Sequence, residues 1–162
     1  MLQTTSMISL NKPFFGKNEK KSLFNCFKNG EWASGGATSF HVEQLLKNKI
    51  KTKNVYLTTS GTAALELAFM TLGVGPGDEV LVPSFTFPTS ASAFMRMGAT
   101  PRFCDVDPET FNVTVDTLSS QWTPKCKGIV VVHYGGRACP MDKINKFARE
   151  KRLWVVEDAA HA

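Results

Sequence analysis

The sequence of 162 residues lacks the features that mark several classes of protein. No apolar run approaches the roughly 18 residues of a membrane-spanning helix. The first residues show neither the basic stretch nor the apolar core of a secretory signal. The four cysteines form no C-x-x-C pair, which argues against a zinc site and against a disulfide framework. We therefore expect a cytoplasmic globular protein that holds no metal.

Two common nucleotide-binding motifs are also missing, because neither G-x-x-x-x-G-K-[ST] nor G-x-G-x-x-G occurs. The net charge is +5, but the basic residues before residue 57 are all lysines. Nucleic-acid-binding surfaces more often combine clustered arginine with aromatic side chains. We interpret these lysines as a solvated surface and expect neither a nucleic-acid nor a membrane partner.

The pattern along the chain changes near residue 53. Residues 1–52 are polar and lysine-rich, and they are expected to form a helical and loop segment with helices at 17–28 and 38–49. Residues 53–162 alternate short apolar runs with helical stretches, which is typical of a parallel α/β sheet. Strands are predicted at 54–58, 79–83, 101–105, 128–133 and 153–156, and helices at 63–72, 89–97, 115–121 and 141–151.

The predicted strands lack in-out alternation, which favours a sheet covered by helices on both faces. The helix at 63–72 is apolar nearly all round and is expected to be buried on several sides. The fold class is therefore a doubly wound α/β domain. Its last strand is followed by no covering helix, which predicts the front part of a larger protein.

Ligands of open α/β sheets bind beyond the carboxyl ends of the strands. The first predicted strand delivers Ser60-Gly61-Thr62 to that edge, at the start of a helix, where free N–H groups favour a phosphate. An ordinary helix N-cap explains the same residues. Phe87 follows the second strand and is either a stacking plate or a core residue.

Asp158 ends the fifth predicted strand and needs a partner there, because an isolated buried charge is costly. A protonated ring nitrogen, a lysine or backbone amides would each serve. Asp105 and Asp107 are interpreted mainly as turn residues. His133 and His161 are each interpreted first as structural histidines.

Five ordered blocks carry a resemblance to a known family. They read T-S-G-T-A-A-L-E-L-A, G-V-G-P-G-D-E-V-L-V-P-S-F-T-F, G-A-T-P-R-F-C-D-V-D-P-E-T, V-V-H-Y-G-G and V-V-E-D-A-A-H-A. Together they resemble the DegT-type sugar aminotransferases, which are pyridoxal-phosphate enzymes of nucleotide-sugar biosynthesis. Two blocks, T-F-P-T-S and V-H-Y-G-G-R-A-C-P-M-D, look closest to the dTDP-4-oxo-6-deoxyglucose aminotransferases (WecE type). The resemblance implies the large domain of the aspartate aminotransferase fold (fold type I), truncated before its last strands and small domain.

The same resemblance implies roles for individual residues. The cofactor phosphate would be held by Ser60, Gly61, Thr62 and Ala63. Phe87 would stack on the pyridine ring, Asp158 would pair with the ring nitrogen, and His161 would hydrogen-bond the cofactor edge. The W-A-S-G-G segment with Trp32 and Gly35 resembles a loop that contacts the nucleotide-sugar.

Family members are homodimers that are expected to use glutamate as amino donor. Their Schiff-base lysine lies downstream of the block that ends at Ala162, so the resemblance implies that this chain holds no catalytic lysine. The main hypothesis is a pyridoxal-phosphate-dependent transamination of a nucleotide-linked keto-sugar, with this chain as its N-terminal part. The alternative is a catalytically inactive fragment that binds the cofactor or a nucleotide-sugar.

Overall fold

A computed structural model describes residues 12–30, 32–33 and 35–162. The chain divides into two compact units, residues 1–57 and 58–162. Each unit is described by itself. No helix within the described residues is both long and apolar enough to cross a membrane.

The first unit holds two helices, α1 (Lys17–Asn29) and α2 (Ala37–Ile50), at the bounds that the sequence predicts to within one residue. The N–H of Gly16 and the carboxylate of Glu19 bond at 2.8 Å and close the first turn of α1. Neither helix contains a buried residue. This unit therefore has no apolar core of its own among its described residues.

The second unit is built on a four-stranded parallel sheet in the order β2-β1-β3-β4. Its strands are β1 (Glu79–Pro83), β2 (Thr100–Cys104), β3 (Cys126–Val132) and β4 (Trp154–Asp158). The expected α/β class is confirmed. Each connection between consecutive strands passes through a helix, as parallel pairing requires.

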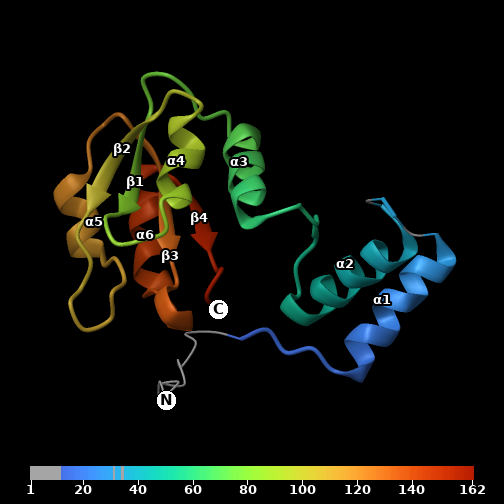
Figure 1. The fold of residues 1–162 in the computed structure, drawn as a ribbon. Helices are drawn as coiled ribbons and strands as arrows, with labels where there is room; N and C mark the ends of the chain where they lie inside the picture. Colours follow the sequence, from blue (N-terminus) through green and yellow to red (C-terminus); the bar gives the residue numbers. More distant parts are fainter. Residues whose placement is uncertain (1–11, 31, 34) are drawn as a thin grey trace, which may run out of the picture. The chain divides into compact units, whose positions relative to one another are not determined.

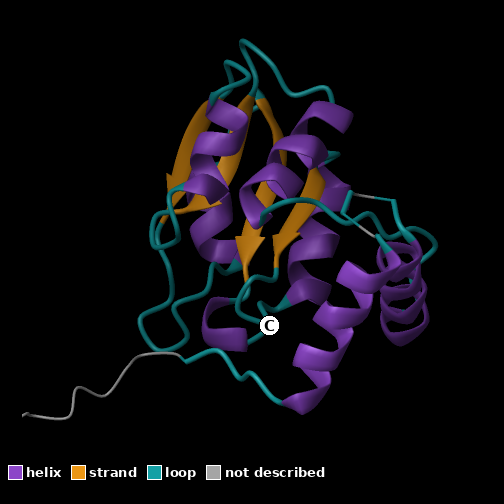
Figure 2. Cartoon of the chain, turned by 45° about the vertical axis from the view of Figure 1, so that its right-hand side comes forward, coloured by secondary structure: helices purple, strands orange, loops and turns teal. Residues whose placement is uncertain are grey.

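Helices cover both faces of the sheet, as Figures 1 and 2 show and as the strand pattern predicts. One face packs against α3 (Gly61–Thr71) and α4 (Thr89–Met95), around Phe69, Phe94, Val80 and Val130. The other packs against α5 (Val115–Gln121) and α6 (Met141–Lys151), where the buried residues include Leu81, Leu118, Ile129 and Ile144. Strand residues two apart point to the same face, so Val80 and Val82 serve one core while Leu81 serves the other.

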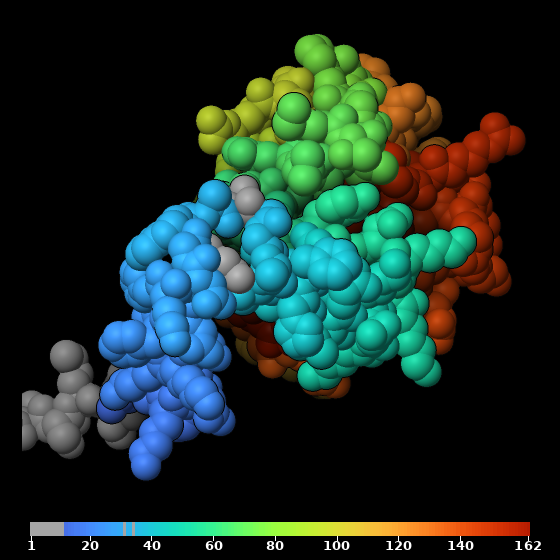
Figure 3. Space-filling model, turned by 90° about the vertical axis from the view of Figure 1, so that its right-hand side faces the viewer, coloured from blue at the N-terminus to red at the C-terminus, as the bar shows by residue number. Residues whose placement is uncertain are grey.

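Two sequence predictions are wrong. Residues 54–58 form no strand. A strand needs a neighbouring strand to pair with its backbone hydrogen-bonding groups. The N–H of Leu57 instead donates a hydrogen bond to the carboxylate of Glu43 on α2 at 3.3 Å. The helix α3 is buried along one side only: Leu65 and Phe69 are buried, whereas Met70 on the outer side is 67% exposed. The surface formed by α3 is drawn green in Figure 3.

Candidate functional site

The four strands point the same way, and their carboxyl ends meet at one edge of the sheet (Figures 1 and 2). The first turn of α3 lies at that same end of the unit (Figure 1). The predicted cofactor residues Gly61 and Asp158 therefore lie at the same end of the α/β unit. Both belong to elements of the face covered by α3 and α4, because Asp158 follows Trp154 and Val156 at two-residue spacing.

A chain of hydroxyl groups holds Asp158. Its Oδ2 accepts a 2.9 Å hydrogen bond from the hydroxyl of Ser90 on α4, and its Oδ1 accepts one from the N–H of Ala160 at 3.1 Å. Because the single proton of Ser90 goes to the carboxylate, Thr86 must donate to Ser90 across their 2.8 Å contact. The half-buried charge is thus stabilised by donors and oriented at the strand end.

Sequence reasoning missed Ser90. Its side chain is fully buried among Ala91, Ala93 and Phe94 of the same helix. The sequence feature that could have identified Ser90 is a serine on the apolar face of a predicted helix, because a buried hydroxyl there needs a hydrogen-bond partner across the core.

The start of α3 supports both interpretations of Ser60-Gly61-Thr62. Ser60 is an N-cap, because its hydroxyl accepts from the N–H of Ala63 at 3.1 Å. The N–H groups of Gly61 and Thr62 precede any intrahelical bond and have no partner within the described residues. A Cβ placed on Gly61 would meet nothing within 4 Å, so space lies beside these donors. This helix start therefore fits an anion such as a phosphate.

Phe87 is 72% exposed and is not a core residue. It lies in the loop between β1 and α4, close in sequence to Thr86 and Ser90. Three other aromatic residues form a separate cluster at the ends of the first three strands: Phe85, Phe111 and Tyr134, with ring centroids 4.9–5.8 Å apart.

The exposed residue His161 contacts the loop that follows β3. Its Nδ1 accepts the N–H of Gly135 at 3.2 Å, and its ring packs edge-on against Tyr134 with centroids 5.3 Å apart. This loop begins with the turn η1 (Tyr134–Gly136), in which Gly135 and Gly136 have positive φ. Within the described residues no hydrogen bond joins His161 to the carboxylate of Asp158, so the two side chains reach the carboxyl ends of the strands independently.

His133 is the structural histidine that the sequence suggests. It is buried, its Nδ1 accepts the N–H of Cys139 at 3.2 Å, and its Nε2 contacts Glu157 at 2.9 Å. Asp107 is a turn residue, as expected: its Oδ1 accepts the N–H groups of Thr110 (2.8 Å) and Glu109 (3.1 Å). The Thr110 donors hold the pKa of the Asp107 carboxyl below its ordinary value.

Trp32 and Gly35 belong to the first unit. Trp32 is exposed and packs edge-on against Phe27 of α1 with centroids 4.9 Å apart, while Gly35 has a φ of 82°. Ser34, between them in the predicted substrate loop, lies outside the described residues.

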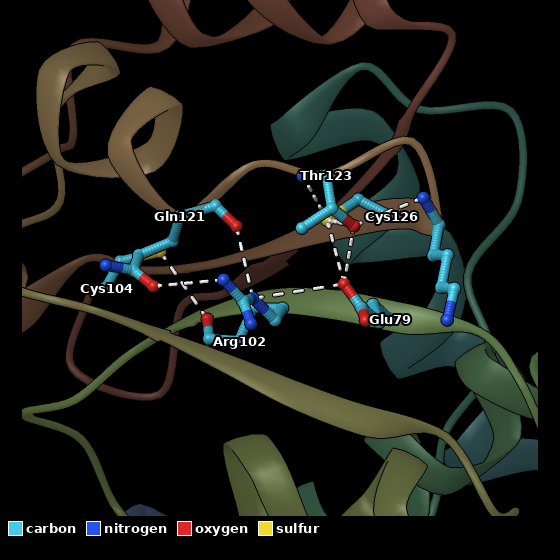
Figure 4. Close-up of polar contacts among 7 residues, drawn as sticks. Glu79, Arg102, Cys104, Gln121, Thr123 and Cys126 are labelled. Atoms are coloured by element: carbon cyan, nitrogen blue, oxygen red, sulfur yellow. Dashed lines mark hydrogen bonds and ion pairs between the residues drawn. The ribbon is translucent and has the colours of Figure 1, made fainter.

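A second polar cluster lies at the opposite, amino-terminal ends of the strands (Figure 4). Glu79 accepts a 2.6 Å bond from the hydroxyl of Thr123, with the guanidinium of Arg102 at 3.9 Å. Arg102 also donates to the carbonyl oxygen of Gln121 at 3.2 Å. These groups pair with one another across β1, β2 and the segment before β3, so we interpret the cluster as structural.

Open parallel α/β sheets bind their ligands beyond the carboxyl ends of the strands, and this chain places a helix start and an oriented carboxylate at that end. The model of the DegT/DnrJ/EryC1/StrS aminotransferase family matches residues 14–162. The chain belongs to this family, whose aminotransferases depend on pyridoxal phosphate.

Individual relatives agree with this assignment. The chain is 38% identical to dTDP-4-dehydro-2,3,6-trideoxy-D-glucose 4-aminotransferase of Saccharopolyspora spinosa over 96% of its own length, and 39% identical to GDP-perosamine synthase of Caulobacter vibrioides, also over 96%. It spans only 41% and 42% of those two proteins. Among solved structures, the aminotransferase TlmJ of Streptoalloteichus hindustanus superposes with a TM-score of 0.91 at 36% identity, over 96% of this chain and 43% of TlmJ.

The structural neighbours are aminotransferases of fold type I, and the sheet described here corresponds to part of their fold. The fold and family expected from the five sequence blocks are thereby confirmed. The narrower resemblance to the WecE type stays a prediction.

Proposed function

We propose that this chain forms the cofactor-binding part of a transaminase that transfers an amino group to a nucleotide-linked keto-sugar. The observation that carries the proposal is the carboxylate of Asp158, oriented by Ser90 and Ala160 at the carboxyl edge. A carboxylate held in this way matches a protonated ring nitrogen. The relatives named as sugar-nucleotide aminotransferases support the substrate class.

The residues present fit pyridoxal phosphate. The N–H groups of Gly61 and Thr62 would bind its phosphate beside the open space at Gly61. The exposed ring of Phe87 is free to stack on the pyridine, and His161 would hydrogen-bond the cofactor edge. When bound, the cofactor supplies an electron sink for carbanion chemistry. Asp158 would keep the proton on the ring nitrogen that this chemistry needs.

The lysine that would carry the cofactor is proposed to lie outside these residues. No lysine occurs between residues 54 and 124. Lys125 and Lys127 lie at the amino end of β3, and the other lysines of the unit are on α6, on the face away from α3 and α4. This placement favours the second candidate for the isolated chain, which is cofactor or nucleotide-sugar binding without turnover.

The remaining assignments rest on the family. We propose a cytoplasmic homodimer of the whole protein with glutamate as amino donor. Trp32 and Gly35 are proposed to contact the nucleotide-sugar.

Cofactor binding is tested by titrating the purified chain with pyridoxal phosphate and following cofactor absorbance and fluorescence. Asp158→Asn keeps the shape of the side chain but removes its charge, so its affinity should fall roughly tenfold or more, as expected for a hydrogen bond to a charged group. Asp105→Asn changes an exposed carboxylate after β2 and is the matched control. Equal affinity of Asp158→Asn and the unsubstituted chain would refute the assigned role.

Catalysis is tested by borohydride reduction of the chain with bound cofactor, followed by mass spectrometry. We expect scattered substoichiometric labelling of lysines and no glutamate-dependent turnover. Stoichiometric labelling of one lysine together with turnover would place the catalytic lysine within this chain.

A further inference from the structure

Asn112 is a buried polar residue that neither the fold assignment nor the cofactor contacts explain. It lies between β2 and α5 and is only 2% exposed. The preceding residue, Phe111, has a φ of 57°, a conformation that costs energy for a bulky side chain. A buried amide is costly unless both its donor and its acceptor find partners.

The oxygen and the nitrogen of the Asn112 side-chain amide both form hydrogen bonds with the loop that follows β3. Its Oδ1 accepts the N–H of Tyr134 at 3.0 Å, and its Nδ2 donates to the carbonyl oxygen of Arg137 at 2.8 Å. The backbone of Asn112 is itself fixed, because its carbonyl oxygen accepts the N–H of Asp107 at 2.9 Å. One side chain therefore holds the first and last residues of a four-residue loop.

The centre of that loop reaches the proposed cofactor residue His161. Gly135 donates its N–H to Nδ1 of His161 at 3.2 Å. A backbone N–H can only donate, so Nδ1 must carry a lone pair, and the neutral ring must hold its proton on Nε2. The loop thus presents His161 as a hydrogen-bond donor at Nε2.

We propose that Asn112 is a positioning residue for His161, acting through the Tyr134–Arg137 loop. By fixing the two ends of the loop, Asn112 keeps the N–H of Gly135 aimed at Nδ1 of His161 and so sets the tautomer of that ring. The functional part of this inference rests on the proposed function, in which the Nε2 proton meets an acceptor on the edge of pyridoxal phosphate.

The first test needs no cofactor. In the ¹⁵N-labelled full chain, long-range ¹⁵N–¹H correlations should show His161 as one tautomer with an unprotonated Nδ1 at a pH where the ring is neutral. Asn112→Ala should make the other tautomer detectable and speed hydrogen exchange of the Gly135 amide by about fivefold to tenfold, as expected from the loss of a hydrogen bond. An unchanged tautomer and unchanged Gly135 exchange would overturn the proposal.

Two further variants separate positioning from a loss of stability. Thr123→Val removes a partly buried hydrogen bond to Glu79 at the opposite end of the strands, so it should destabilise the chain without altering His161. Asn112→Ser keeps a smaller polar group that can satisfy only one of the two bonds, and its effect on Gly135 exchange should be intermediate. If Asn112→Ala fails to fold, Asn112→Ser decides the test, and wild-type behaviour of that variant would overturn the proposal.

The second test uses pyridoxal phosphate as the probe. Asn112→Ala should weaken binding severalfold in the chain with His161, but have no effect when His161→Phe is already present, because the role of Asn112 is transmitted through that ring. An equal loss in both backgrounds would contradict positioning. Failure of the unsubstituted chain to bind pyridoxal phosphate would refute the proposed function, while the tautomer result would still judge the role of Asn112.

Discussion

The hydroxyl of Ser90 on α4 donates a 2.9 Å hydrogen bond to Oδ2 of Asp158 at the end of β4. This bond joins α4 to β4, an outermost strand of the described sheet, across 68 positions of sequence. The carboxylate of the proposed cofactor site therefore depends on a residue that sequence reasoning did not select.

Ser90→Ala should destabilise the chain, because it leaves a half-buried carboxylate without one of its donors. We expect a loss of about 1–3 kcal/mol in the free energy of unfolding, measured by chemical denaturation. Ser92→Ala, on the same helix, is the control, and an equal loss there would show that the bond to Asp158 is not responsible.

Gly136→Ala should be more damaging than Gly135→Ala. Both positions have positive φ, at 80° and 60°, so each substitution costs roughly 1–2 kcal/mol for the left-handed backbone. At Gly136 the added Cβ would also lie 2.9 Å from the carbonyl oxygen of His161, whereas at Gly135 it would meet nothing within 4 Å. Thermal unfolding of the two variants measures the difference, and equal melting temperatures would contradict the contact.

One cysteine should react much faster than the other three. Burial raises the pKa of the Cys104 thiol to about 12 and that of Cys139 to about 11, so little nucleophilic thiolate forms near pH 8. Cys126 is also buried, whereas Cys26 is partly exposed. A thiol-reactive dye should show one fast phase that Cys26→Ser removes. Persistence of that phase in the variant would disprove the assignment.

Asp107 should contribute stability that is lost in acid. Its pKa is lowered in the folded chain by hydrogen bonds from Thr110, so its contribution is fully present above the unfolded-state pKa of about 3.9. It disappears as the pH falls through the lower folded-state pKa. Asp107→Asn should therefore be less stable than the unsubstituted chain at pH 6, with a gap that narrows below pH ~4. A stability gap that stays constant as the pH falls below ~4 in denaturation experiments would contradict this role of Asp107.

The outer side of α3 should promote self-association of the isolated chain. Leu67 and Met70 are exposed there, and exposed apolar patches favour association. Replacing both with glutamine should shift sedimentation toward the monomer, while Glu66→Gln on the same helix should not. A monodisperse unsubstituted monomer would refute this prediction.

The sequence predicts well what depends on local periodicity. The helices at 115–121 and 141–151 and the strand at 79–83 are observed at the predicted bounds. The prediction of a strand at 54–58 is wrong because an apolar run does not by itself specify a pairing partner. The position of Asp158 at the end of a strand could be predicted, because this residue closes an apolar run. The roles of Ser90 and Asn112 were not, because each depends on which distant backbone or side chain lies opposite in the folded sheet.

Within the described sheet β4 is an outermost strand, and this position links ligand binding to the stability of that strand. An edge strand has only one neighbour and is the first to fray. Asp158 is carried by this strand, and its bond to Ser90 fastens the strand end to α4. A cofactor that binds Asp158 would select molecules in which the edge is already in place and would stabilise them by mass action. Saturation with ligand would then protect β4 amides more than those of β1, which makes the outermost strand the most sensitive indicator of an occupied site.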